Sequence, residues 1–223
     1  MSPSIIADDP ETQGTVQQKS SHPTPSLFAH AVLRTTPANY QPMITFYIRL
    51  LNATIVHTSP VLTFLRYDSE HHRIAILQTP DVLPKPQSAI HAGLDHLAFT
   101  YNSLSELAQV YTSLKSRSEA AEPILPIWCV NHGPTTSMYY RDPDGNKIEL
   151  QVDNFDSKEG ADAFMGSELF AENPIGTDFD PEEWAREVFA RGGGDGKGLD
   201  GAQDREMKKR REIGSRMDVP AGF

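Results

Sequence analysis

The chain has little cysteine, no excess of positive charge and no long apolar run. Cys129 is the only cysteine in 223 residues, so no internal disulfide can form. Together with an N-terminus that lacks the pattern of a secretory signal, this predicts a reducing, cytoplasmic location. The apolar runs are strand-length and are broken by His, Arg or Asp, well below the roughly 18 residues of a membrane span. We therefore expect no membrane association.

Acidic residues outnumber basic ones. The formal net charge is −10 and the isoelectric point is about 5.2. Nucleic-acid binding depends on clustered Lys and Arg, so we expect no nucleic-acid partner. The one basic run, residues 208–211, is interpreted as a solvated charge run near the C-terminus, although an anionic contact or an address signal is the alternative reading.

The length allows one compact catalytic unit between two irregular ends. Residues 1–24 are rich in Ser, Thr, Pro and Gln without apolar periodicity, which predicts a disordered leader. Residues 192–223 begin with a glycine cluster and continue highly charged, which predicts a flexible tail. Between them we expect a catalytic domain over residues 25–156 and a helical extension over residues 157–191. In that extension Asp180, followed by a proline, is a helix N-cap candidate.

The catalytic segment repeats one pattern twice. Residues 27–79 and residues 93–153 each predict a strand with a central histidine, then a helix, then three strands, which is a βαβββ module. The histidines are His30 and His96. The helices are expected over 40–51 and 104–117. The strands are expected over 27–33, 53–57, 61–67, 72–78, 93–99, 124–130, 135–141 and 147–152.

The predicted fold class is α+β, with the two βαβββ modules paired into one eight-stranded, partly open barrel and helices outside. Neither module is long enough to bury both faces of its own sheet, so pairing the sheets is the physical solution. Strand alternation places His96 and Glu149 on the face away from the helices. The helix-covered face takes Leu97, Phe99, Ile148, Leu150 and Val152.

The same alternation allows His30 to point into the cavity with His96 and Glu149. Two histidines and one carboxylate on one face of a metal ion are the ligand set of non-haem Fe(II) enzymes. Taken singly, each residue is better explained as a hydrogen-bonded or exposed strand residue. The equivalent places of His30 and His96 in the two modules favour a shared metal site. A structural zinc site would need more cysteine.

The run from Val130 to Glu149 contains His132, Tyr139, a Pro-x-Gly turn and the terminal glutamate in that order. It resembles the signature of type I extradiol dioxygenases. The two-module architecture resembles the vicinal oxygen chelate superfamily, which includes glyoxalases and bleomycin-resistance proteins. Within it, the chain looks most like single-domain relatives of biphenyl-2,3-diol 1,2-dioxygenase. The resemblance covers about residues 27–155 and, more loosely, residues 173–176 and the helix after them.

The resemblance implies a role for each candidate residue. The metal ligands would be His30, His96 and Glu149, with Fe(II) as the cofactor and Mn(II) as the alternative. The catalytic residues would be His72, His132 and Tyr139. His72 is preferred to His71 because it shares strand parity with Ile74 and Ile76. The substrates would be a small aromatic diol and O2, with His72 moving a proton of the diol and the other two stabilising developing charge.

Two other functions remain open at this point. Another metal-dependent enzyme of the superfamily, such as an isomerase, a hydrolase or a non-cleaving oxygenase, could use the same fold. A glyoxalase-like site would call for an acidic ligand near the end of the fourth strand, where residues 76–78 offer no carboxylate. A non-catalytic small-molecule binding protein would need no metal triad. A homo-oligomer is compatible with the sequence.

Overall fold

The computed structural model describes residues 22–86, 92–116, 122–192, 199–211 and 219–220, so most of the predicted leader lies outside the described residues. The described strands form a four-stranded and a five-stranded sheet. The first, in the order β1-β4-β3-β2, contains β1 (Ala31–Thr35), β2 (Thr54–Thr58), β3 (Leu62–Arg66) and β4 (Ile74–Gln78). The second, in the order β5-β8-β7-β6-β9, contains β5 (His96–Tyr101), β6 (Trp128–Asn131), β7 (Thr135–Arg141), β8 (Lys147–Asp153) and β9 (Thr177–Asp178).

The two sheets repeat one topology, which confirms the predicted βαβββ modules. β1 runs parallel to β4 and β5 runs parallel to β8, whereas the other pairs are antiparallel. The first strand of each module therefore lies beside the last one. β9 adds two residues to the edge of the second sheet and was not predicted, because two residues are too few to show a strand pattern.

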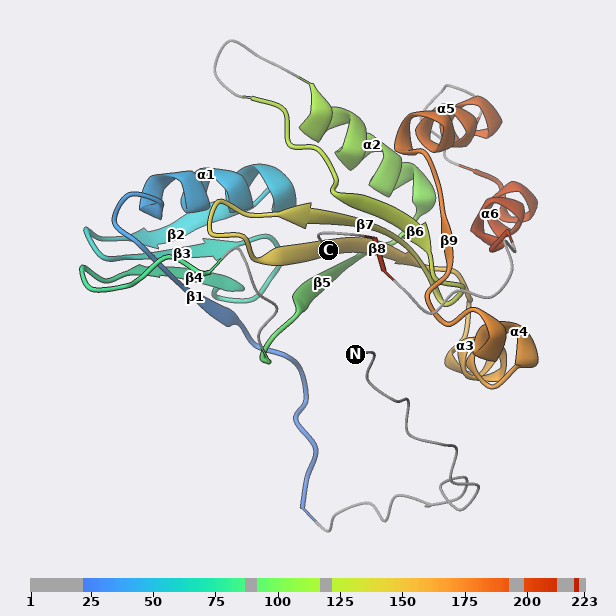
Figure 1. Cartoon of the computed structure of the whole chain (residues 1–223), viewed down its shortest axis with the longest axis horizontal. Coiled ribbons are helices and arrows are strands. Elements are labelled where there is room, and N and C mark those ends of the chain that lie inside the picture. Colours follow the sequence, from blue (N-terminus) through green and yellow to red (C-terminus); the bar gives the residue numbers. More distant parts are fainter. Residues whose placement is uncertain (1–21, 87–91, 117–121, 193–198, 212–218, 221–223) are drawn as a thin grey trace, which may run out of the picture.

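One helix of each module covers its sheet. Figure 1 shows α1 (Tyr40–Leu51) over the first sheet and α2 (Leu104–Lys115) over the second, on the same side. Both helices bury apolar stripes, and the Ser103 side chain caps α2 by accepting a hydrogen bond from the Glu106 amide. As predicted from strand parity, Ile148, Leu150 and Val152 are buried under this layer. In the described part of the chain, no helix has the length and apolarity needed to span a bilayer.

The predicted barrel is open between its two modules. The described strands make two separate hydrogen-bonded sheets rather than a single eight-stranded one. β1 and β5 are edge strands of their sheets, and Figure 1 shows them along the same side of the molecule, away from α1 and α2. A cavity of about 310 Å³ opens between them, lined by Phe28 and Ala31 on one side and by Leu97 and Ala98 on the other. Because the edges are not hydrogen-bonded, the two sheets stay open towards each other.

The modules are joined on the helix side by a tight turn. The turn between β7 and β8 places Asp142 against α1, where the buried Tyr47 hydroxyl donates a hydrogen bond to its carboxylate at 2.9 Å. Next to it, the Asn39 side-chain amide donates to the Asp144 carboxylate at 2.6 Å. A turn of the second module is thus fixed to a helix of the first by charge-assisted hydrogen bonds.

Replacing Tyr47 by phenylalanine is expected to lower the free energy of unfolding by about 1–3 kcal/mol, because a buried carboxylate loses a donor. Urea unfolding measures the change. Tyr40→Phe is the matched control, since the Tyr40 hydroxyl contacts only neutral oxygens of Ser59 and Thr63 within its own module. An equal decrease in the free energy of unfolding of both variants would show that the hydrogen bond from Tyr47 to Asp142 contributes no more than one between neutral groups.

Four more helices lie in the described residues of the C-terminal part. These are α3 (Lys158–Met165), α4 (Glu168–Glu172), α5 (Pro181–Arg191) and α6 (Gly201–Lys208). The predicted N-cap of α5 is confirmed, since the Asp180 carboxylate accepts from the Glu183 amide at 2.8 Å. α6 lies within residues 192–223, where the sequence predicts a flexible tail. A capping box between Asp200 and Gln203 and the buried side chain of Met207 account for this helix.

Candidate active site

The open face of the second sheet carries a row of side chains with potential chemistry. Strand register places Glu149 of β8 between Ala98 of β5 and Tyr139 of β7, and places Trp128 of β6 beyond Tyr139. The rings of Trp128 and Tyr139 stack at 5.2 Å between centroids. Side chains on one face of a sheet alternate with those on the other, so the row faces away from α2. Its centre is the buried carboxylate of Glu149.

His96 at the start of β5 meets Glu149 directly. Its Nε2 lies 3.0 Å from a carboxylate oxygen of Glu149. The hydrogen bond to Glu149 raises the pKa of His96 above its usual value, against the opposing effect of burial. Burial would raise the pKa of Glu149, but hydrogen bonds from His96 and Ser137 hold it below its usual value. The Glu149 carboxylate thus has the His96 imidazole beside it. These two residues are two of the three predicted metal ligands.

Asp95 is a residue of this site that the sequence reasoning missed. Its carboxylate lies 2.8 Å from Nδ1 of His96 and also accepts from the Lys147 ammonium at 2.6 Å. This carboxylate fixes the ring orientation and directs Nε2 at Glu149, as carboxylates behind ligand histidines do in many metal sites. The sequence signal that could have identified Asp95 is its position directly before His96, a candidate ligand.

Tyr139 and His132 form the second part of the site. The Tyr139 hydroxyl lies 2.9 Å from Nε2 of His132, and Nδ1 of His132 lies 2.5 Å from the carbonyl oxygen of Ile175. A carbonyl can only accept, so Nδ1 carries the proton, and in the neutral ring Nε2 accepts from the phenol. Burial lowers the pKa of His132, which favours that neutral form. Burial and the charge of Glu149 raise the pKa of Tyr139, so the phenol stays protonated.

His30 and His72 lie together on the first module. Their ring centroids are 4.4 Å apart, and His72 also stacks on Phe64 at 4.3 Å. The predicted strands began too early in both cases, because β1 starts at Ala31 and β4 starts at Ile74. Strand parity therefore applies to neither histidine. His72 is half-buried whereas His71 is exposed.

The six predicted residues are thus brought together as two groups. His96, Glu149, Tyr139 and His132 form one group on the second sheet, and His30 and His72 form the other on the first module. Within the described ranges, no three His, Cys, Asp or Glu side chains are close enough to share one metal ion. His30 directly precedes Ala31, which lines the cavity between β1 and β5. The third predicted ligand therefore lies near the junction of the sheets but apart from the other two.

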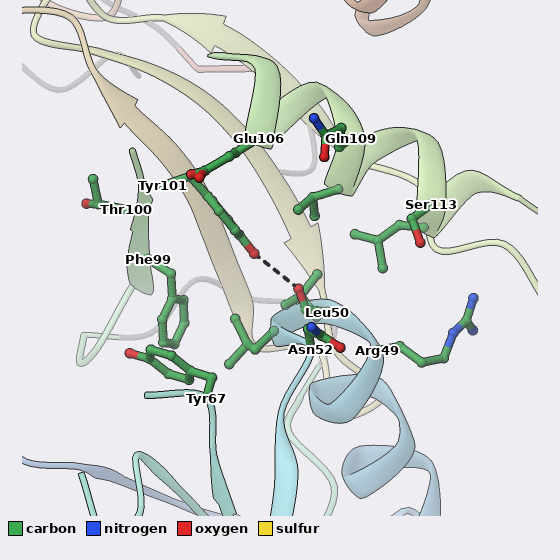
Figure 2. A pocket seen from close by; sticks show the side chains of 13 residues that line it. Arg49, Leu50, Asn52, Tyr67, Phe99, Thr100, Tyr101, Glu106, Gln109 and Ser113 are labelled. Carbon is green, nitrogen blue, oxygen red and sulfur yellow. Dashed lines mark hydrogen bonds between the residues drawn. The ribbon is translucent and has the colours of Figure 1, made fainter. Parts of the chain in front are cut away.

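A larger hollow, of about 570 Å³, lies elsewhere. Figure 2 shows it between the end of α1, β5 and α2, with the Tyr101 hydroxyl hydrogen-bonded to the Leu50 carbonyl. Its lining includes Phe99, on the helix-covered face of β5, and Glu106 of α2. None of the six predicted site residues lines it. It is distinct from the candidate site.

Comparison with known proteins identifies the family of this chain. Residues 28–150, more than half of the chain, match the family model described as the Glyoxalase/Bleomycin resistance protein/Dioxygenase superfamily. The chain belongs to this superfamily. Among solved structures, lactoylglutathione lyase from Agrobacterium tumefaciens is 21% identical, with a TM-score of 0.42, covering 57% of this chain and 94% of that chain.

Two curated relatives are much closer in sequence. Biphenyl-2,3-diol 1,2-dioxygenase 2 of Rhodococcus globerulus is 43% identical over 154 residues, which are 69% of this chain and 77% of the relative. Biphenyl-2,3-diol 1,2-dioxygenase 3 of the same organism is 42% identical over 159 residues, which are 71% and 79% of the two chains. The match thus extends over most of both relatives.

Proposed function

We propose that this protein is an extradiol ring-cleaving dioxygenase, which inserts both atoms of O2 into a catechol-type aromatic diol and opens the ring. The observation that carries the proposal is the pairing of His96 with a buried Glu149, next to the hydrogen-bonded Tyr139 and His132. This arrangement of side chains lies in a chain that is 43% identical to biphenyl-2,3-diol 1,2-dioxygenase 2, which supports the proposal.

The proposed cofactor is Fe(II), with Mn(II) as the alternative. His30, His96 and Glu149 would hold it, and two nitrogens with one carboxylate suit such an ion. The Asp95 carboxylate on Nδ1 of His96 supports this assignment, since it leaves Nε2 for the cation. Because His30 lies apart from the other two, it has to approach them for all three to bind one ion. When bound, the metal would lower the pKa of the diol hydroxyls and hold substrate and O2 together.

Each remaining residue has a separate task in this proposal. Tyr139 stays protonated, so it acts as a donor rather than as a base. Its single O–H points to His132 before substrate binds and would turn to a substrate oxygen afterwards. His132 accepts from Tyr139 and keeps the phenol oriented. His72 is the proposed group that accepts a proton from the diol and returns it, as a neutral imidazole can.

The partners follow from the same chemistry. We propose a small aromatic diol and O2 as substrates, a cytoplasmic location and no nucleic-acid or membrane partner. The reasons are the net charge of −10 and the single cysteine. The buried stack of Trp128 on Tyr139 offers an aromatic wall beside the site, which suits a planar ring.

Anaerobic loading tests the function. The protein is purified without oxygen, loaded with Fe(II) or Mn(II), analysed for bound metal and mixed with a panel of catechols. We expect about one metal ion for the single proposed site, oxygen uptake in step with diol consumption, and the visible absorbance of yellow ring-opened products. Chelation before mixing is expected to abolish all three.

The alternatives give different results in the same assay. A binding protein would take up a diol without retaining metal or consuming oxygen. Another metal-dependent enzyme of the superfamily would retain metal and leave every catechol intact. Either result would refute the dioxygenase proposal.

A further inference from the structure

The basic run of residues 208–211 is attached to the candidate site. The Asn131 side-chain amide, at the end of β6, donates to the Lys208 carbonyl at 2.8 Å, and the Thr177 hydroxyl of β9 donates to the Arg211 carbonyl. Arg210 lies between these two attachments and is partly buried. The run is therefore held against the second sheet at successive positions.

The Arg210 guanidinium donates to three backbone carbonyls that are distant in sequence. These are the carbonyls of His132 at 3.1 Å, Asn173 at 2.5 Å and Leu169 at 2.9 Å. The guanidinium also lies 5.1 Å from the centroid of the Phe164 ring. A guanidinium presents five N–H groups in a rigid plane, so one side chain can bind the His132 turn and the end of α4 at once.

These two segments determine the orientation of the His132 ring. The first is the backbone of His132 itself. The second is the turn after α4, where the buried Asn173 side chain bonds both the amide and the carbonyl of Gly176, at 2.8 and 3.1 Å. That turn presents the Ile175 carbonyl to Nδ1 of His132. Arg210 thus connects the His132 backbone with the loop that fixes its ring.

The packing at this junction leaves no spare room. Gly176 has a φ of +116°, and a Cβ there would lie 2.3 Å from the Asn131 carbonyl. Gly133 has a φ of +103°, and a Cβ there would lie 2.1 Å from the Phe164 ring. The two turns approach each other as closely as glycine allows, so a shift in one is transmitted to the other.

We propose that Arg210 is a positioning residue for the proposed ring-cleavage reaction, on which this inference rests. By bridging the carbonyls of His132 and Asn173, it holds the His132 ring where Tyr139 needs its acceptor. Arg210 touches neither substrate nor metal in this role. It acts through the turn that carries His132.

The first test needs no activity. Amide hydrogen exchange of the peptide spanning residues 131–135 is measured in the full chain for the wild type, Arg210→Ala, Arg210→Lys and Lys209→Ala. We expect about tenfold faster exchange in Arg210→Ala, because the turn loses its anchor. Lys209→Ala is the matched control, since the exposed Lys209 ammonium pairs with Glu206 of α6 at 3.0 Å. It should exchange like the wild type.

The second test separates positioning from stability. In the Fe(II)-loaded protein, Arg210→Ala is expected to lower kcat by about 10- to 100-fold with little change in KM, since misplacing an orienting group affects the reacting geometry. Arg210→Lys keeps the charge but cannot bridge three carbonyls, so an intermediate kcat is expected. Millimolar guanidinium should restore part of kcat in Arg210→Ala and none in Lys209→Ala.

The outcomes are distinguishable. Unchanged exchange and kcat in both Arg210 variants would overturn the proposal, as would an equal effect of Lys209→Ala. If Arg210→Ala does not fold, the proposal is tested with Arg210→Lys alone, by its amide exchange over residues 131–135 and its kcat. Should the wild type cleave no catechol, the proposed function fails, and the exchange result alone then decides whether Arg210 holds the turn.

Discussion

Replacing His96 by alanine is expected to abolish Fe(II) retention and ring cleavage together. The Nε2 atom of His96 lies 3.0 Å from the Glu149 carboxylate, so the substitution removes one proposed ligand and leaves the other buried without its partner. Losing even a hydrogen-bond partner of a ligand weakens metal binding about 10- to 100-fold, and loss of the ligand itself should exceed that. Metal analysis after anaerobic gel filtration and oxygen uptake measure the two effects.

His57→Ala is the control for this experiment. His57 lies on the exposed strand β2, with its ring near Phe64, and belongs to neither half of the candidate site. It should keep full metal and activity. Normal iron content and turnover in His96→Ala would show that the metal centre has been assigned to the wrong residues.

The variant His30→Ala tests whether His30 is the third metal ligand. In the structure His30 lies beside His72, apart from the His96–Glu149 pair. If His30 is a ligand, its alanine variant loses iron as His96→Ala does. If instead the variant retains iron and shows only a lower kcat, His30 acts with His72 on the substrate, and the third ligand is another group.

The order of the secondary structure elements was predictable because the repeat supplies the information twice. The helix predicted over residues 40–51 is α1 with the same bounds, and the helix predicted over 104–117 is α2 with an end two residues earlier. The placement of His96 and Glu149 on one face was also predictable. Both lie inside regular strands, where alternation holds, and β5 and β8 are adjacent.

The same reasoning failed where regular structure ends. His30 and His72 each precede the first residue of a strand, so alternation says nothing about their direction. The sheet junction was similarly hidden, because the contacts of Tyr47 with Asp142 join positions 95 residues apart. Sequence patterns report local periodicity and carry no direct signal for such contacts.

The C-terminal segment was harder to predict for a different reason. Three hydrogen bonds of Arg210 go to backbone carbonyls, and a carbonyl is present at every residue, so no sequence pattern marks these partners. α6 buries little besides Met207, which gives it almost no apolar periodicity. Its capping box, Asp200 with Gln203, was the one visible signal, and the glycine cluster before it favoured the reading of a flexible tail.

Replacing Tyr139 by phenylalanine is expected to spare the metal and lower kcat by about 100- to 1000-fold, the usual effect of removing one donor aimed at developing charge. The Tyr139 hydroxyl is 2.9 Å from Nε2 of His132, and the raised pKa of this buried phenol, next to the Glu149 charge, keeps it a donor. The ring itself, stacked on Trp128, is retained in phenylalanine. Metal analysis measures the metal content, and steady-state kinetics on the best catechol measure kcat.

Tyr140→Phe is the matched control for that variant. Tyr140 is the next residue of β7 and therefore points to the opposite face, where its buried hydroxyl lies 3.7 Å from the Met138 sulfur. It should change kcat by less than about twofold, because it loses a weak hydrogen bond away from the site. If Tyr139→Phe turned over as fast as Tyr140→Phe, the phenol would have no part in the chemistry. The hydrogen bond to His132 would then serve stability, and a double variant with His132→Gln should show no further loss of kcat.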